Sequence, residues 1–401
     1  MELKSKQLDF INKHFSLLVL VLASGAFFLT NIILKEHLSS ENYGLYSIFI
    51  TYISLLSSFG MLGLEQVIMR NSKILSDKVI ISKNLLIPII LSILFVSILG
   101  SYLFINNYNI SATYIFLSIF TLLVILTKLI SNLFRLLSMF TFSQIALNLW
   151  KLALFLVLLI LIFRGESINI KDINSIIFLL LVVTMFMAFF IIRRVKFSHT
   201  ISIESFFSQA FLFLLSLVTI SLINYGDRFF IESRFGLDEL GSYFFFINLF
   251  LFPFTLLQSY VGFKELISFK LLYNHSLLVK KLNQILRYSI LFAIFLFVVA
   301  FLIDFFGFYK IDLLKNLQMI VLFLILGIIK VIYSIFSSAM GAICDNKMLY
   351  KTNMYSIISI LLLIPVIYYY ATTITITIMF LIVLWIIRCI IWYKQLSSFE
   401  N

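Results

Sequence analysis

The sequence has few charged residues, few cysteines and very little proline. Of its 401 residues, 12% are charged and 62% are apolar, whereas soluble domains carry about 25% charged and about 45–50% apolar residues. Only three prolines and thirteen glycines occur, which excludes collagen and low-complexity linkers. Polar residues are too scarce to cover a soluble particle of this size. The chain is therefore predicted to lie in lipid.

Metal-binding and catalytic motifs are also missing. Cys344 and Cys389 give neither a disulfide framework nor the spacing of metal ligands. The patterns HExxH, GxSxG, GxxxxGKS/T and GxGxxG do not occur, so zinc hydrolysis, serine hydrolysis and nucleotide binding have no support in the sequence. We therefore predict no metal, no cofactor and no enzymatic activity.

Twelve stretches are long and apolar enough to cross a bilayer, which takes about 20 residues each. The last two could instead be one broken helix, because Pro365 and a run of threonines interrupt them. The first follows a basic start without a small-residue cleavage site, which favours a retained signal anchor. The predicted spans lie near 14–34, 45–64, 84–105, 113–134, 143–163, 173–192, 208–227, 241–262, 284–303, 316–340, 353–370 and 373–393.

The distribution of lysine and arginine predicts the orientation. With the N-terminus in the cytoplasm, 20 of the 30 basic residues fall on the cytoplasmic side, 7 on the other side and 3 inside spans. The cytoplasmic set includes Arg388 and Lys394, in or beside the C-terminal tail. Because cytoplasmic loops carry the excess of Lys and Arg, both termini are predicted to be cytoplasmic. Most of the net charge of +12 is then a topology signal, and nucleic-acid binding is not expected.

Two pairs of segments suggest an internal duplication. Residues 41–50 match 238–247 at an offset of 197, sharing an acid, Gly, Tyr, Phe and Ile, and residues 128–134 match 330–336 at an offset of 202. An even number of spans separates the copies, which predicts parallel repeats, an arrangement known among transporters. The predicted fold is an all-α integral membrane protein with two six-helix lobes around a central cavity. The predicted domains are 1–192, a cytoplasmic linker at 193–207, and 208–401.

Several polar residues fall inside the predicted spans. A lysine or arginine at a helix centre costs about 2.5–3.5 kcal/mol on insertion scales, so such residues are expected to face protein or water. Unpaired cations there favour an anionic guest, a carboxylate or a phosphate, while amides suit sugar hydroxyls. The candidate cationic ligands are Lys128, Arg135, Lys151 and Lys330, and the candidate polar ligands are Asn31, Gln144, Asn148, Asn224 and Asn248.

Simpler interpretations stand beside this hypothesis. Hydroxyl stripes such as Thr121 and Ser131 often only let membrane helices approach closely. Arg135 and Lys151 are near enough to span ends to reach the interface by snorkelling. For Asp227 and Arg228, pairing with each other or with Glu232 at the outer surface is an equally good interpretation.

One family resemblance covers essentially the whole chain. The segments Asn31-Ile-Ile-Leu-Lys, Leu38-Ser-Ser-Glu-Asn-Tyr-Gly-Leu-Tyr46 and Gly63-Leu-Glu-Gln66, followed by Arg70, resemble polysaccharide transporters of the multidrug/oligosaccharidyl-lipid/polysaccharide exporter superfamily. Within it the chain is most similar to O-antigen flippases of the Wzx type. The motifs are diffuse and contain no catalytic signature.

The resemblance implies translocation of an undecaprenyl-diphosphate-linked oligosaccharide between the leaflets of a bacterial inner membrane. It also implies alternating access, coupling to an H⁺ or Na⁺ gradient, and a place beside a polysaccharide polymerase and chain-length proteins in lipopolysaccharide biosynthesis. The expected partners are thus the lipid-linked substrate, the bilayer and these proteins.

Other functions remain open. A multidrug exporter of the same superfamily is expected to use buried carboxylates, and mid-span Asp and Glu are nearly absent. A peptidoglycan-precursor flippase is expected to have two further spans. A membrane-embedded polysaccharide polymerase is expected to need a sizeable outer loop, and the longest one, about 228–240, is short. It nevertheless carries five charged residues that would have to act together: Arg228, Glu232, Arg234, Asp238 and Glu239.

Overall fold

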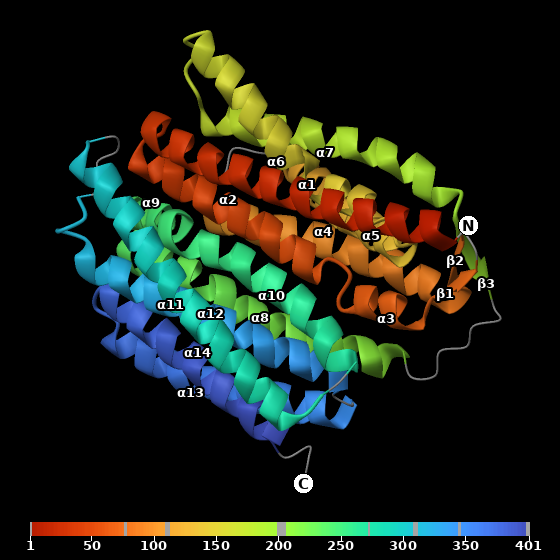
Figure 1. The fold of residues 1–401 in the computed structure, drawn as a ribbon. Coiled ribbons are helices and arrows are strands. Elements are labelled where there is room, and N and C mark those ends of the chain that lie inside the picture. Colours follow the sequence, from red (N-terminus) through yellow and green to blue (C-terminus); the bar gives the residue numbers. More distant parts are fainter. Residues whose placement is uncertain are drawn as a thin grey trace. The chain divides into compact units, whose positions relative to one another are not determined.

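The computed structural model describes residues 2–75, 78–108, 113–198, 206–271, 273–307, 312–343 and 346–397. Nearly all of them are helical (Figure 1). The chain forms two compact units, Met1–Ser221 (unit 1) and Leu222–Asn401 (unit 2). The domain limits expected from the sequence, and a cavity shared by two lobes, stay predictions. Of the expected linker, residues 199–205 lie outside the described residues.

Unit 1 is built from long helices with polar caps. The Ser39 side chain accepts a hydrogen bond from the Asn42 N–H, and the Thr113 side chain accepts one from Phe116. Such caps satisfy N–H groups that have no partner within the helix. The helices are α1 (Glu2–His37), α2 (Ser40–Phe59), α3 (Leu64–Asn71), the 3₁₀ turn η1 (Lys83–Leu85), α4 (Leu86–Tyr108), α5 (Tyr114–Leu136), α6 (Phe140–Phe163), α7 (Ile170–Ile192) and the first part of α8 (Phe206–Phe235).

Unit 2 begins with the second part of α8 and, like unit 1, continues with a series of long helices. Its last two predicted spans are separate helices, and Pro365 lies inside the first of them. The expected repeat segments begin α2 and α9 in one pair and lie in α5 and α12 in the other. The further elements are α9 (Leu237–Phe246), the π-helical turn η2 (Ile247–Leu251), α10 (Phe252–Leu271), α11 (His275–Phe305), α12 (Leu317–Ile343), α13 (Asn346–Tyr370) and α14 (Ile374–Ser397).

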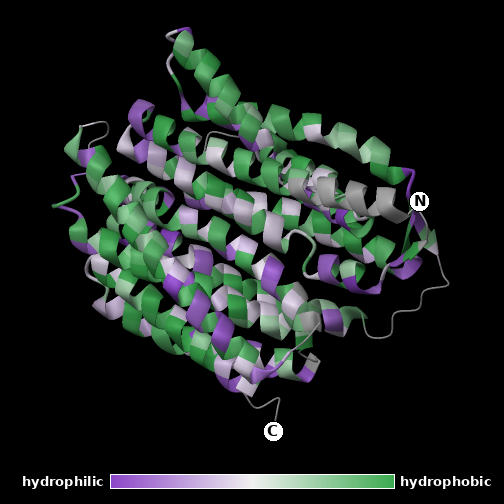
Figure 2. Cartoon of the chain, in the orientation of Figure 1, coloured by the Kyte–Doolittle hydropathy of each residue, from purple (hydrophilic) through white to green (hydrophobic). Residues whose placement is uncertain are grey.

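The prediction of a multi-pass membrane protein is confirmed. Among the described residues, 11 helices are long and apolar enough to cross a membrane, or 12 if α2 and α3, bent by 46°, form one span. Figure 2 shows hydrophobic residues along most of each helix, with hydrophilic residues concentrated at ends and connections. Large apolar side chains such as Ile87 and Phe190 are exposed, as expected where the solvent is lipid.

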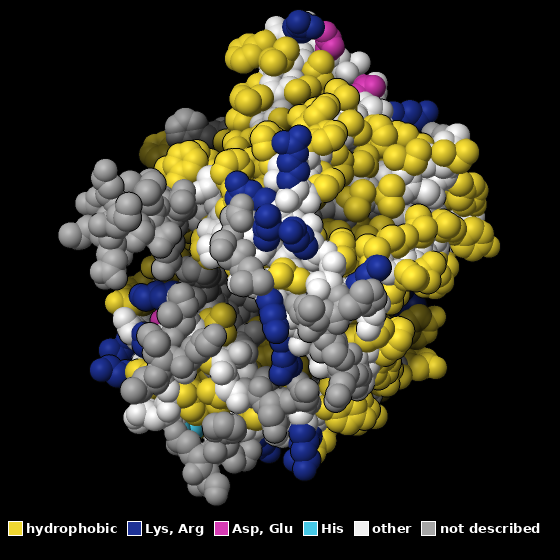
Figure 3. Space-filling view, turned by 90° about the vertical axis from the view of Figure 1, so that its right-hand side faces the viewer, with side chains coloured by type: hydrophobic (Ala, Val, Ile, Leu, Met, Phe, Trp, Pro, Cys, Tyr) yellow, Lys and Arg dark blue, Asp and Glu magenta, His cyan; other side chains and the backbone are white. Residues whose placement is uncertain are grey.

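A small sheet in unit 1 was not expected from the sequence. Strand β2 (Lys78–Ser82) pairs antiparallel with β1 (Lys73–Leu75) and parallel with β3 (Val195–Ser198). Val79 and Ile81 of β2 are buried. Figure 3 views the molecule from the right-hand side of Figure 1 and shows several Lys and Arg side chains on that face. The connections that form the sheet are themselves basic. The basic residues in and beside the strands are Arg70, Lys73, Lys78, Lys83, Arg193, Arg194 and Lys196.

Several hydroxyl groups in the spans join helices. The Thr121 hydroxyl on α5 is 2.8 Å from the Tyr52 hydroxyl on α2 and 3.2 Å from Ser101 on α4. Ser131 donates to the Ser143 carbonyl at 3.0 Å, linking α5 to α6. For these residues the structure supports the packing interpretation, because their hydrogen bonds are used within unit 1.

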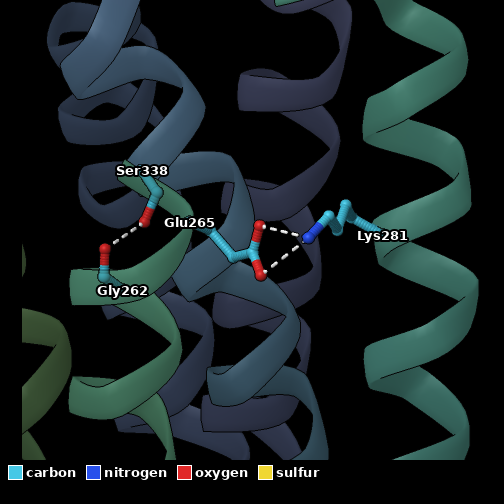
Figure 4. A network of polar contacts seen from close by, with 4 residues as sticks. All are labelled: Gly262, Glu265, Lys281 and Ser338. Atoms are coloured by element: carbon cyan, nitrogen blue, oxygen red, sulfur yellow. Dashed lines mark hydrogen bonds and ion pairs between the residues drawn. The ribbon is translucent and has the colours of Figure 1, made fainter. Parts of the chain in front are cut away.

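Polar contacts also fasten the interior of unit 2 (Figure 4). The Ser338 hydroxyl on α12 donates to the Gly262 carbonyl on α10 at 2.9 Å. One turn further along α10, the buried Glu265 forms an ion pair with Lys281 on α11. Lys281 Nζ lies 3.0 Å from Glu265 Oε2. Three neighbouring helices are thus held together at the same level.

Candidate functional site

Three of the predicted ligands form a row on α6. Gln144, Asn148 and Lys151 are spaced by about one helical turn, so their side chains share a face. The Asn148 amide donates to Gln144 Oε1 at 3.0 Å. The Lys151 ammonium in turn donates to Asn148 Oδ1 at 2.9 Å. The two amides therefore orient the ammonium group, a relation that their spacing suggested but did not establish.

Aromatic rings surround the same ammonium group. Lys151 Nζ lies 5.6 Å from the centroid of the Phe27 ring on α1 and 5.7 Å from that of Trp150. The two rings pack edge to face. Aromatic faces stabilise a desolvated cation and also provide stacking surfaces. Asn31, one turn beyond Phe27 on α1, is fully buried.

Lys128 on α5 adds a second positive charge to this part of unit 1. It is half-buried, and its charge acts on both Lys151 and the Glu65 carboxylate. Glu65 is buried on α3 and accepts a hydrogen bond from the Asn132 amide at 3.4 Å. In the described part of the chain, no carboxylate forms a direct ion pair with either lysine. We call Lys128, Lys151, Asn148, Gln144 and Glu65 the α5–α6 cluster. Because it contains two lysines and one carboxylate, the cluster has an excess of positive charge.

Arg135 lies apart from this cluster. It is in the last turn of α5, and its side chain is exposed. Its expected role as a substrate ligand stays a prediction, as do the roles of the other candidate ligands.

Unit 2 contains a buried lysine with a different environment. Lys330 on α12 is 7% exposed, and its Nζ lies 5.1 Å from the centroid of the Trp385 ring on α14. Its charge interacts with Asp227 and Arg228 of α8. Tyr243 on α9 donates a hydrogen bond to the Asp227 carboxylate. We call Lys330, Asp227, Arg228, Tyr243 and Trp385 the α8–α12 cluster.

Asp227 and Arg228 do interact, as one interpretation of the sequence held, but they do so in the interior of unit 2 and not at an outer surface. The Asp227 side chain is buried, and α8 continues past it to Phe235. Arg228 lies beside it, with its guanidinium carbon 5.4 Å and 5.1 Å from the ring centroids of Tyr225 and Phe244. Asp227 is thus an acid within a membrane-spanning helix, in a sequence where such acids are few.

The two remaining amide candidates lie near this cluster in the sequence. Asn224 is half-buried on α8, one turn before Asp227. Asn248 is buried in the π-helical turn η2, and its amide donates to the Phe244 carbonyl at 2.8 Å. Asn248 therefore stabilises the local helix, because its amide satisfies a carbonyl of the preceding turn.

Comparison with known proteins identifies the family. Residues 11–263 match the model of a family described as polysaccharide biosynthesis protein. The chain belongs to this family. No curated protein matches the sequence.

Solved structures show that this polysaccharide biosynthesis family member has the fold of MOP superfamily transporters. A MOP superfamily transporter from Pyrococcus furiosus, described as having a binding pocket of reverse polarity, is 14% identical with a TM-score of 0.58, covering 98% of this chain and 95% of that one. An outward-facing multidrug resistance MATE family transporter of the same superfamily is 12% identical with a TM-score of 0.56, covering 98% and 96%. At such identities the likeness establishes the fold alone.

Sequence reasoning did not place the acidic members of the two clusters, or the aromatic members of the α8–α12 cluster, beside the lysines of this family member. Tyr243 lies in one of the duplicated segments, so the duplication drew attention to its neighbourhood without showing its partner. Glu65, Asp227 and Trp385 come close to the lysines only through helix packing. No local pattern could have revealed them.

Proposed function

We propose that this protein is a flippase that moves an undecaprenyl-diphosphate-linked oligosaccharide across a bacterial inner membrane. The observation that carries the proposal is the hydrogen-bonded row Gln144–Asn148–Lys151 beside Lys128, in a chain of a polysaccharide biosynthesis family. A diphosphate is the anionic guest that a cluster with excess positive charge favours. The amides and aromatic faces of the same cluster suit the hydroxyls and ring faces of a sugar.

In this mechanism the protein binds and moves its substrate without covalent chemistry. Lys128 and Lys151 hold the diphosphate, Asn31, Gln144 and Asn148 contact sugar, and the polyprenyl tail stays in the bilayer. Lys330, Arg135, Asn224 and Asn248 complete the proposed set of ligands. Alternating access exposes the headgroup first to one face of the membrane and then to the other, coupled to an H⁺ or Na⁺ gradient. A polysaccharide polymerase and chain-length proteins act on the product, and both chain termini lie in the cytoplasm.

The central experiment is complementation of a deletion strain. Without the protein, we expect lipid-linked repeat units to accumulate on the cytoplasmic leaflet. The wild-type gene should clear them. Lys151→Gln should fail to do so, while Lys151→Arg should retain part of the activity because it keeps the charge. Lys171→Gln is the matched control, since Lys171 is exposed on α7. Equal rescue by Lys151→Gln and Lys171→Gln would refute the role of this lysine.

Charge reversal tests the cationic requirement more severely. Lys128→Glu and Lys330→Glu should each abolish rescue, because an acidic side chain repels a diphosphate. Immunoblotting of the membrane fraction would establish that the variants insert. Intact transport in either inserted variant would contradict the model.

A multidrug exporter is the second candidate, favoured by one observation. The buried Asp227 carboxylate is the kind of group that a cation-coupled pump uses. This function predicts that cells carrying the protein expel a cationic dye, that Asp227→Asn abolishes the expulsion, and that deletion traps no lipid-linked sugar. The flippase proposal predicts the reverse for both the dye and the sugar.

A further inference from the structure

Arg388 is a buried cation of unit 2 that the proposed function does not use. It lies on α14 and is 1% exposed. Its Nε donates to the Tyr333 hydroxyl on α12 at 3.0 Å. The guanidinium carbon is 5.1 Å from the centroid of the Tyr333 ring and 5.3 Å from that of Trp392. Arg388 is predicted to lie in or beside the C-terminal tail, although it falls near the end of the span predicted at 373–393, and in the structure it is buried within α14 (Ile374–Ser397).

Two buried N–H donors at this position lack acceptors among the described residues. They are Arg388 Nη1 and Trp392 Nε1. Leaving a buried donor without a hydrogen bond costs about 1–3 kcal/mol, and more when the group is charged. The two residues are four apart on α14, so they share a face of the helix. Both donors are therefore available to an anion bound at this face of α14.

The described carboxylates buried in unit 2 are engaged elsewhere. Asp227 accepts a hydrogen bond from Tyr243 and interacts with Arg228 and Lys330. Glu265 is paired with Lys281. Among the described residues, Arg388 therefore has no carboxylate to balance its charge. A buried charge without a partner is strongly destabilising, so the guanidinium needs a counter-ion from another source.

We propose that unit 2 binds a small monovalent anion, such as chloride, at Arg388 Nη1 and Trp392 Nε1. The anion would accept both hydrogen bonds and neutralise the guanidinium. The surroundings are closely packed, which limits the guest to a small ion. The Tyr333 ring contacts both Trp385 and Trp392 edge to face, with centroids 5.0 Å and 5.1 Å away, and Tyr333 and Trp385 are each 1% exposed. A diphosphate would need more donors and more room. The proposal is independent of the transported substrate.

The tryptophans allow a direct test on the full chain in detergent. The sequence has three tryptophans, so Trp150→Phe leaves only Trp385 and Trp392 as fluorescent reporters. Chloride is titrated against gluconate at constant ionic strength. We expect a saturable change in emission and a rise in the thermal unfolding midpoint. Arg388→Gln should lose both responses, whereas Lys347→Gln should keep them, because Lys347 is exposed on α13.

A second variant keeps the test decisive if Arg388→Gln does not fold. Trp392→Phe keeps an aromatic ring at this position but removes the pyrrole part of the indole, and with it the N–H donor. A hydrogen bond to an ion is strong, so we expect the dissociation constant for chloride to rise about tenfold, read from Trp385. An unchanged constant, or equal responses in Arg388→Gln and Lys347→Gln, would overturn the proposal. So would the absence of any saturable response, or a response to inorganic pyrophosphate but not to chloride.

Discussion

The Tyr243 hydroxyl donates a hydrogen bond to the Asp227 carboxylate in the interior of unit 2. The carboxylate also attracts the charges of Arg228 and Lys330. Asp227 thus provides negative charge where two cations are taken out of water. This relation explains how a lysine is accommodated within the apolar helix α12.

The first prediction concerns that carboxylate. Asp227→Asn removes the charge that balances Lys330 and weakens the hydrogen bond from Tyr243. Because hydrogen bonds to charged groups contribute about 1.5–3 kcal/mol, we expect the free energy of unfolding to fall by a similar amount, measured by denaturation in mixed micelles. Asp238→Asn, at an exposed position, should change it little. Equal stability of the two variants would show that Lys330 does not depend on Asp227.

The second prediction concerns the orientation of Lys151. Asn148→Leu removes the acceptor of the Lys151 ammonium, and we expect the rate of flipping to fall about tenfold through the loss of one charge-assisted hydrogen bond. Gln144→Leu should have a smaller effect, because Gln144 accepts from Asn148 instead of from the lysine. The rates are measured from the appearance of lipid-linked repeat units at the outer leaflet. A larger loss in Gln144→Leu would contradict this order.

The third prediction compares two ion pairs by double-mutant cycles. Glu265 and Lys281 have side chains that are 4% and 21% exposed, and we expect a coupling energy of about 1–3 kcal/mol. Arg164 and Glu166 are 3.8 Å apart with side chains 70% and 52% exposed. For such a surface pair we expect a coupling of about 0–1 kcal/mol. Denaturation of the single and double variants measures both coupling energies. Similar coupling energies for the two pairs would show that burial does not determine their strength.

The fourth prediction concerns a glycine at the start of α3. Gly63 has a φ of +84°, and a Cβ there would lie 2.3 Å from the Ala210 carbonyl oxygen of α8. Gly63→Ala must therefore displace backbone, and it adds strain of about 1–3 kcal/mol at this φ. Gly165 also has a positive φ, +70°, but a Cβ there meets nothing within 4 Å. Thermal unfolding should show a clearly larger loss for Gly63→Ala than for Gly165→Ala.

The membrane class and most helices could be predicted because long apolar stretches are a strong local signal. The errors arise where a helix continues past its apolar stretch. The span predicted at 208–227 belongs to a helix ending at Phe235, and that near 373–393 belongs to one ending at Ser397. Asp227 and Arg388 lie at or near the ends of those predicted spans, so both are predicted to be peripheral. Their burial depends on neighbouring helices that hydropathy does not reveal.

The candidate lysines could be found from the cost of placing charge in lipid, but their partners could not. Lys151, Asn148 and Gln144 share one helix, so their spacing predicts proximity. Phe27 reaches Lys151 from α1, and Glu65 lies near Lys128 from α3. Such contacts depend on tertiary packing, which a single sequence does not specify. The sheet was missed for the same reason, since β2 and β3 are short and far apart in the chain.

The parallel pairing of β2 with β3 joins the entrance of α4 to the exit of α7. The stretch of four successive helices, α4 to α7, thus begins and ends at the same place, where backbone hydrogen bonds between β2 and β3 join its two ends. Neighbouring ends are the geometry that permits a chain to be reconnected in a new order. The stretch α4–α7 accordingly has adjacent ends, which suits it to circular permutation or to transfer between related proteins.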